Sequence, residues 1–146
     1  MSASAAEAVA ILPKICRQLG AMTGTIHRVD GNHLVLQEAF EIPETVKEQI
    51  RRIPKGKGMA GQAWSTARPA QTCNLAADPS AAIQPRARHV HAGAAVAAPI
   101  TDESGIIWAV VGLGFPPEKT MDEEAVDAVG QEAVALVRSL LGRAQR

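Results

Sequence analysis

The stretch that decides the fold is IPKGKGMAG, residues 53–61. Its glycines are spaced Gly56-x-Gly58-x-x-Gly61, which formally matches the fingerprint of dinucleotide-binding sites. Such a site needs a strand before the glycines, a full helix after them and a parallel βαβ unit. The preceding residues are expected to be helical, and Pro69 stops the following helix early. The glycines therefore predict a tight turn into a short helix, and not a nucleotide site.

Apolar spacing and turn residues predict the elements on both sides of this turn. Before it we expect a helical segment over 3–20 that begins or kinks at Pro13, a hairpin of Thr23–Val29 and His33–Phe40, and an amphipathic helix carrying Val46, Ile50 and Ile53. After it we expect a helix at Gln62–Thr66, a strand at Ala70–Cys73, a long loop at Asn74–Gly93, a hairpin of Ala94–Ile100 and Ile106–Phe115, and a helix over 122–142. This order predicts one α+β domain over 1–146 whose core, residues 21–121, contains an antiparallel sheet.

Composition excludes several classes of protein. The chain has 146 residues, 47% of them hydrophobic and 21% charged, which is typical of one soluble domain. Its 15 basic and 15 acidic residues give no net charge, so we expect no nucleic-acid partner. The sequence contains no apolar run of the roughly 20 residues that a membrane helix needs. Its 2 cysteines form neither a disulfide framework nor a metal pattern, so we expect a cytoplasmic protein without metal or cofactor.

A family resemblance rests on several segments that follow one another along the chain. They are residues 53–61, Asn74–Pro79, Pro99, Val110–Leu113 and the acidic start of the last helix. Over Leu19–Leu141 the sequence resembles the GAF domain family. The resemblance implies a bacterial protein. It also implies a GAF-like α+β fold with a central antiparallel sheet. It also implies that the terminal helices pack on one face, often as dimer contacts, and that a ligand cavity lies under loops on the other.

The candidate ligand-binding residues lie around the glycine turn and the long loop. The backbone N–H groups at a helix start can attract an anion or a polar atom. The candidates are Met59, Ala60 and Trp64 beside the turn, Arg86, Arg88, His89 and His91 in the loop, and Val96 in the next strand. Alternatives stay open, because Trp64 can be core packing and a charged loop can simply be solvated.

Enzymatic relatives within the resemblance are disfavoured by their missing cysteines. Free methionine sulfoxide reductases resemble this chain at Gly56–Gly61, but they typically carry cysteine at the position of Ala60 and further cysteines in the loop. Cys73 has no evident resolving partner here. Bilin-binding relatives usually have histidine after their cysteine, whereas Asn74 follows Cys73. We therefore expect no catalytic residues and no enzymatic activity.

The function expected is that of a sensor. A small polar or anionic ligand, with nitrate as one candidate, would bind near the glycine turn and bias a homodimer or the binding of a sensor-kinase or other regulatory partner. We expect the signal to pass to another molecule, because no output domain follows Arg146. The alternative is a ligand-free interaction module whose interior is filled by Met59, Trp64, Trp108 and Phe115, and the third hypothesis is a thiol-dependent reductase.

Overall fold

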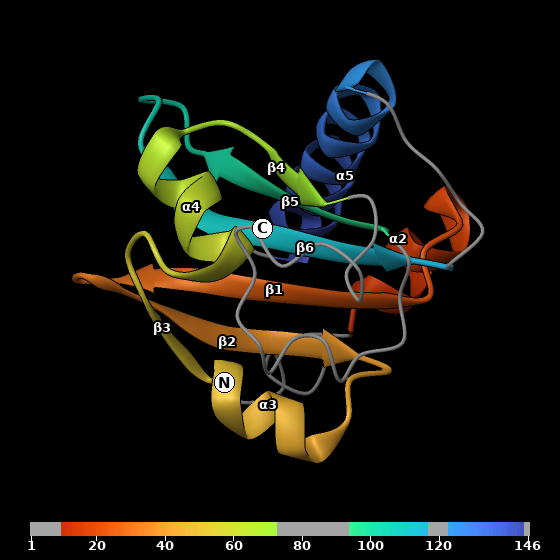
Figure 1. Cartoon of the computed structure of the whole chain (residues 1–146). Coiled ribbons are helices and arrows are strands. Elements are labelled where there is room, and N and C mark those ends of the chain that lie inside the picture. Colours follow the sequence, from red (N-terminus) through yellow and green to blue (C-terminus); the bar gives the residue numbers. More distant parts are fainter. Residues whose placement is uncertain (1–9, 73–93, 117–122, 145–146) are drawn as a thin grey trace.

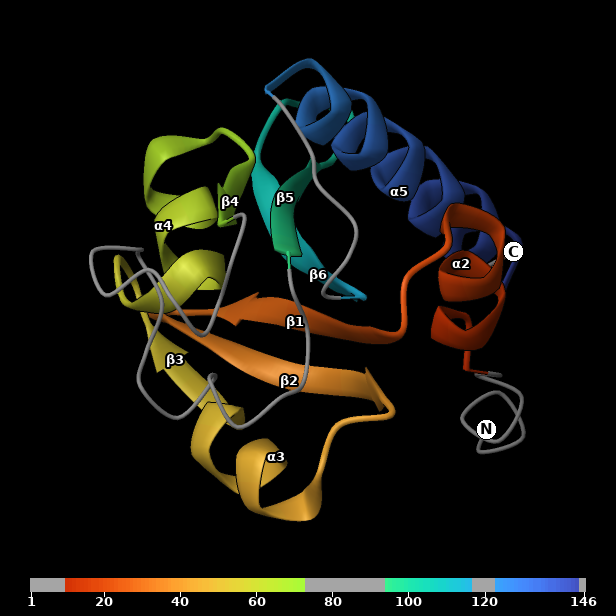
Figure 2. The same cartoon turned by 45° about the vertical axis from the view of Figure 1, so that its right-hand side comes forward.

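The computed structural model describes residues 10–72, 94–116 and 123–144. Within these residues a six-stranded sheet runs in the order β3-β2-β1-β6-β5-β4, and every neighbouring pair is antiparallel. Helices cover both faces of this sheet (Figures 1 and 2). The strands are β1 (Thr23–Asp30), β2 (His33–Phe40), β3 (Arg52–Pro54), β4 (Ala70–Thr72), β5 (Ala94–Thr101) and β6 (Ile107–Phe115).

Two hairpins form the middle of the sheet, as the alternating sequence predicts. Strands β1 and β2 turn at Gly31, whose φ of +64° suits the two-residue connection. Strands β5 and β6 turn where Asp102 Oδ1 accepts backbone N–H bonds from Ser104 at 2.8 Å and Ile106 at 3.0 Å. The hairpins join through β1 and β6, which pair from Thr23 opposite Gly114 onward. The predicted α+β fold with a central antiparallel sheet is confirmed.

The terminal helices α2 (Leu12–Leu19) and α5 (Glu123–Ala144) pack side by side on one face (Figure 2). Two long-range contacts fix them. Glu38 Oε2 on β2 accepts the backbone N–H of Leu12 at 2.8 Å, and Arg138 donates to the carbonyl and hydroxyl oxygens of Thr101 at 3.0 and 2.6 Å. The buried cluster beneath them contains Ile11, Leu12, Ile15, Cys16, Ile26, Val96, Ala98, Ile100, Ala109, Val111, Leu113, Phe115, Val126, Ala133 and Val137.

The opposite face carries α4 (Gly58–Thr66), and α3 (Glu44–Ile50) packs beside β2 at the other end of the sheet (Figure 1). A second buried cluster lies under α4 and consists of Leu34, Ile53, Ala63, Trp64, Ala97 and Val110. The sheet therefore separates two cores, one beneath the terminal helices and one beneath α4.

The first helix that the structure describes begins at Leu12 with Pro13 in its first turn, and the predicted helical residues 3–9 lie outside the described part. Two other predicted boundaries differ from the structure. Ile53 belongs to β3 and not to a helix, because it pairs with Leu34 of β2. Helix α4 starts at Gly58, four residues before the predicted start. Cys73 and the loop over 74–93 lie outside the described residues.

Candidate functional site

The site begins at the glycine turn, which folds back tightly on the first turn of α4. Gly56 and Gly58 have φ of +85° and +65°, a conformation that favours glycine. The N–H of Gly56 donates to the carbonyl of Gly61 at 3.0 Å, and the N–H of Lys57 donates to that of Pro54 at 3.1 Å. A Cβ on Gly61 would lie 2.9 Å from the Pro54 oxygen, so only glycine fits this close approach. The glycines serve the turn, as the sequence predicts.

These bonds limit which backbone groups could meet a ligand. The N–H groups of Gly56 and Lys57 point into the turn and are already bonded. Gly61 begins the regular bonding of the helix, since its N–H donates to the carbonyl of Lys57 at 3.0 Å. Helical geometry leaves the N–H groups of the residues between, Gly58 to Ala60, without an acceptor inside the helix. The backbone N–H groups with which the turn could meet a ligand are thus those of Gly58 to Ala60, at the start of α4.

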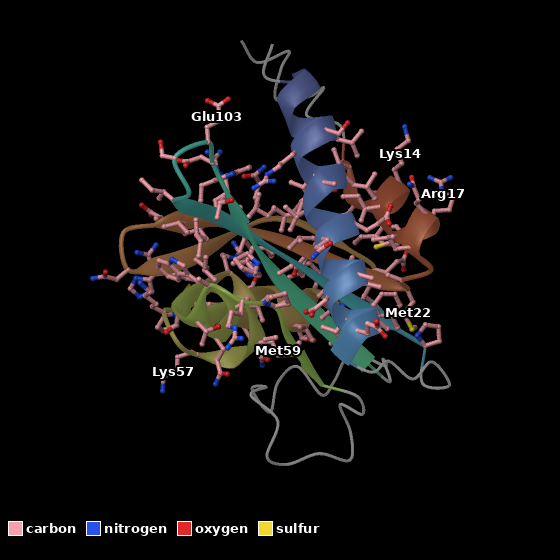
Figure 3. The ribbon with its side chains drawn as sticks, turned by 90° about the horizontal axis from the view of Figure 1, so that it is seen from above. Lys14, Arg17, Met22, Lys57, Met59 and Glu103 are labelled. Carbon is pink, nitrogen blue, oxygen red and sulfur yellow. The ribbon has the colours of Figure 1, made fainter. Side chains whose placement is uncertain are left out.

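The predicted site residues Met59, Ala60 and Trp64 all lie on α4 at the second cluster. Met59 and Ala60 are partly buried against the second cluster, and Trp64 belongs to it with 8% of its surface exposed. Lys55 Nζ lies 4.9 Å from the centre of the Trp64 ring, which is a cation–π distance. Figure 3 shows Lys57 and Met59 at α4, on the other side of the molecule from Lys14 and Arg17 of α2.

The other predicted site residues do not join this group. Val96 lies in the cluster beneath α2 and α5, so its side chain points to the face opposite α4 and away from Met59 and Trp64. Neighbouring Ala97 faces α4 instead, because successive strand residues alternate between faces. Arg86, Arg88, His89 and His91 lie outside the described residues and stay predictions.

The aromatic residues predicted to fill one interior are divided between the two faces. Met59 and Trp64 pack in the α4 cluster, whereas Phe115 is buried beneath the terminal helices and Trp108 packs against that same cluster. Arg28 stacks over Trp108, with 5.7 Å between its guanidinium carbon and the ring centre. The four side chains therefore do not meet, and the interaction-module hypothesis loses the packing argument on which it was based.

His27 is a candidate site residue that the sequence patterns do not indicate. It lies on β1 opposite Val110 of β6, and facing residues of neighbouring strands project to the same side of the sheet, so His27 points to the α4 face. Only 2% of its surface is exposed. Its Nε2 lies 2.9 Å from the carbonyl oxygen of Ile50 at the end of α3. Its Nδ1 is buried without a hydrogen-bond partner among the residues that the structure describes.

The electrostatics of His27 follow from its burial. Burial lowers the pKa of the imidazole below its ordinary value of 6.5, and the hydrogen bond to Ile50 opposes this effect only in part. The ring is accordingly neutral near pH 7. The sequence carries a weak signal for this residue, since it is a histidine flanked by Ile26 and Arg28 in an alternating strand. Its partner is 23 residues away, which periodicity alone does not reveal.

Cys16 is the cysteine that the structure describes, and it lies away from α4. It is a free thiol buried beneath the terminal helices. Burial, with a smaller effect from the negative charge of Glu38, raises the pKa of this thiol to about 11. Thiolate chemistry is therefore suppressed at Cys16.

The described part of the chain has neither a metal cluster nor a membrane-spanning helix. Within residues 10–72, 94–116 and 123–144, no three His, Cys, Asp or Glu side chains gather closely enough to hold a metal ion. In the same ranges, none of the helices has the length and apolar character required to cross a membrane.

Comparison with known proteins agrees with the fold. A family model described as a GAF domain matches residues 2–136. No curated protein matches the chain. Among solved structures, the A. aeolicus nlh2 GAF domain in an inactive state is 20% identical over 92% of this chain and 79% of that one, with a TM-score of 0.69.

Two further structures show the same architecture. The GAF domain of a phosphoenolpyruvate-protein phosphotransferase from Coxiella burnetii is 16% identical over 92% of this chain and 81% of its own, with a TM-score of 0.68. The free methionine-R-sulfoxide reductase from Neisseria meningitidis, in complex with its substrate, is 17% identical over 90% and 73%, with a TM-score of 0.65. At these identities the likeness establishes the fold alone.

Proposed function

The chain belongs to the GAF domain family, and we propose that it is a sensory module that binds a small polar or anionic ligand on the α4 face of its sheet. One observation carries the proposal: the buried Nδ1 of His27 has no partner among the described residues on the face where the family resemblance implies a ligand cavity. Buried polar atoms in folded proteins are nearly always hydrogen-bonded. An unpaired one is a reason to expect a ligand group or a water there.

The response to the ligand would pass through a homodimer or a regulatory partner protein, such as a sensor kinase. The contact between α2 and α5 supports this (Figure 2), because it places both helices on the face away from the proposed site. Val134 and Leu136 of α5 are only partly buried there and could contribute to such a contact. Sedimentation of the purified protein with and without ligand tests this part of the proposal.

The primary test is a thermal-shift screen against nitrate and other small anions, cyclic nucleotides, amino acids and methionine sulfoxide. A ligand at one hundred times its dissociation constant adds about 2.7 kcal/mol to stability, which is several degrees for a domain of this size. A shift with one chemical class is the expected result. A flat panel, together with a stable dimer in solution, would instead favour the ligand-free interaction module.

The loop arginines predicted from sequence can be tested in the same screen. The double substitution Arg86→Ala and Arg88→Ala should weaken an anionic ligand while leaving the unfolding temperature of the free protein unchanged. Arg28→Ala is the control for a loss of positive charge elsewhere, because it removes one arginine that stacks on Trp108, on the other face of the sheet from α4. Equal affinity in all three proteins would remove the loop arginines from the proposed site.

We also propose that the protein is not a thiol-dependent reductase, although one solved structure of similar fold is a methionine sulfoxide reductase. Ala60, which carries no thiol, stands where the resemblance implies the reductase cysteine, and Cys16 is buried on the opposite face with a raised pKa. Assay of the purified protein with free methionine-R-sulfoxide and a thiol reductant should show no turnover above background. Turnover that disappears in Cys73→Ser would overturn this proposal.

A cytoplasmic location belongs to the same proposal. The free, buried thiol of Cys16 supports it, since unpaired cysteines are usual in a reducing compartment. Cell fractionation with an antibody against the protein tests the assignment.

A further inference from the structure

We propose that Nδ1 of His27 accepts a hydrogen bond from the ligand, so that the site selects small organic molecules with an N–H or O–H donor over bare inorganic anions. This inference rests on the proposed function and narrows its ligand class. The groups that carry it are the two ring nitrogens of His27 and the carbonyl of Ile50.

The hydrogen bond to Ile50 determines which nitrogen carries the proton. Nε2 of His27 lies 2.9 Å from the carbonyl oxygen of Ile50, and a carbonyl oxygen can only accept. Nε2 must therefore be the donor. In a neutral imidazole one nitrogen donates and the other accepts, so Nδ1 presents a lone pair. Helix α3, which ends at Ile50, thus fixes the tautomer of a histidine on β1.

Burial keeps the ring in this neutral form. The side chain is 2% exposed, and burial disfavours the charged imidazolium. A bare anion such as nitrate offers acceptors only, and its contact with the lone pair of Nδ1 would be repulsive. To bind it, the buried ring would have to take up a proton. A ligand with its own N–H or O–H meets the lone pair without that step.

The position of the ring places Nδ1 on the same face as the predicted contact residues of α4. His27 faces Val110 across the β1–β6 pair, and Val110 shares its cluster with Trp64. Met59 packs against that cluster as well. A ligand there would be covered by apolar side chains, and an unpaired donor on it would be costly to bury. The lone pair on Nδ1 of His27 therefore favours ligands that carry an N–H or O–H donor over ligands that carry acceptors only.

The first part of the test reads the protonation of His27 in the unmodified protein. Long-range ¹H–¹⁵N spectra of uniformly labelled protein report which imidazole nitrogens carry protons. The four histidines give four ring patterns, and His27 is assigned as the one missing from His27→Gln. We expect a protonated Nε2 and an unprotonated Nδ1 at pH 7. The opposite tautomer, or a doubly protonated ring, would overturn the inference.

The second part uses probes that differ in donors. L-amino acids, L-lactate and cyclic AMP carry N–H or O–H groups, whereas nitrate, propionate and pyruvate carry none at pH 7. We expect binding from the first group only, with a shift of the Nδ1 resonance of His27. His27→Gln should reduce the affinity of that probe about tenfold, because glutamine can still donate to Ile50 but has no acceptor at the Nδ1 position.

The outcomes separate the inference from the proposed function. Binding of nitrate, propionate or pyruvate, or binding of a donor probe that leaves the Nδ1 resonance unchanged, overturns the inference and keeps a ligand-binding sensor. Failure of every probe to bind overturns both. Should His27→Gln fail to fold, the resonance shift in the unmodified protein decides alone, with assignment by conventional backbone-to-side-chain correlation.

Discussion

Replacement of His27 by glutamine should change how the stability of the protein depends on pH. The unfolded chain binds a proton at this histidine below its ordinary pKa of about 6.5, whereas burial keeps the folded ring neutral to lower pH. Between the lowered pKa of the folded state and 6.5, the unfolded state therefore holds more protons. Stability must fall as the pH falls through this window, and it must be independent of His27 above it.

The magnitude follows from the burial of the ring. With 2% of its surface exposed and its pKa lowered, the folded His27 binds a proton less readily than the unfolded chain does. The upper bound of the penalty is that of a folded ring that takes up no proton, about 1.4 kcal/mol at about pH 5.5 and about 2 kcal/mol at about pH 5. The first value is a tenfold change in the folding equilibrium.

Urea denaturation followed by circular dichroism, at a series of pH values from about 5 to 9, measures the effect. His27→Gln is compared with the unmodified protein, because it retains a donor for Ile50 and cannot titrate. The free-energy difference between the two should be constant from about pH 7 to 9 and move in favour of the variant below about 6.5. A difference that is flat over the whole range, or that moves in favour of histidine at low pH, would refute the reasoning.

Two other features lead to testable effects on stability and reactivity. Gly61→Ala should lower the free energy of unfolding by about 1–3 kcal/mol, because its Cβ would lie 2.9 Å from the carbonyl of Pro54. Gly130→Ala, whose Cβ would meet its neighbours at 3.5 Å or more, should raise it by about 0.5–1 kcal/mol, and the same urea titration compares them. In a Cys73→Ser protein, Cys16 should react with a thiol reagent at pH 8 only upon unfolding. Its pKa of about 11 leaves about one Cys16 side chain in a thousand as the reactive thiolate at that pH. Rapid labelling of the folded protein would contradict this.

Sequence patterns were sufficient for the elements with strong periodicity. The two hairpins and the last helix lie where alternation and apolar spacing place them, and the glycine turn has the tight geometry that its composition indicates. The edge strand β3 was missed because Ile53 follows Ile50 at helical spacing. Only its pairing with Leu34 on β2 makes it a strand, and that contact is distant in sequence.

The site was less predictable than the fold, for two physical reasons. The face on which Val96 lies could not be predicted, because a strand's facing reverses with a shift of one residue and β5 has no polar alternation to set it. His27 was overlooked because its role depends on the carbonyl of Ile50, a backbone group that every residue carries. Met59 and Trp64, which the structure brings together in one cluster, follow the glycine turn closely in the chain.

Within the described part of the chain, the two outermost strands of the sheet are three residues long, which affects how this protein can associate. Each edge, β3 at Arg52–Pro54 and β4 at Ala70–Thr72, offers only a few backbone groups to an incoming strand. Pro54 removes one of the donors at its edge. Growth of the sheet from chain to chain, the route by which long open edges lead to aggregation, is therefore disfavoured. Association through helices is the mode of contact that these short edges leave open.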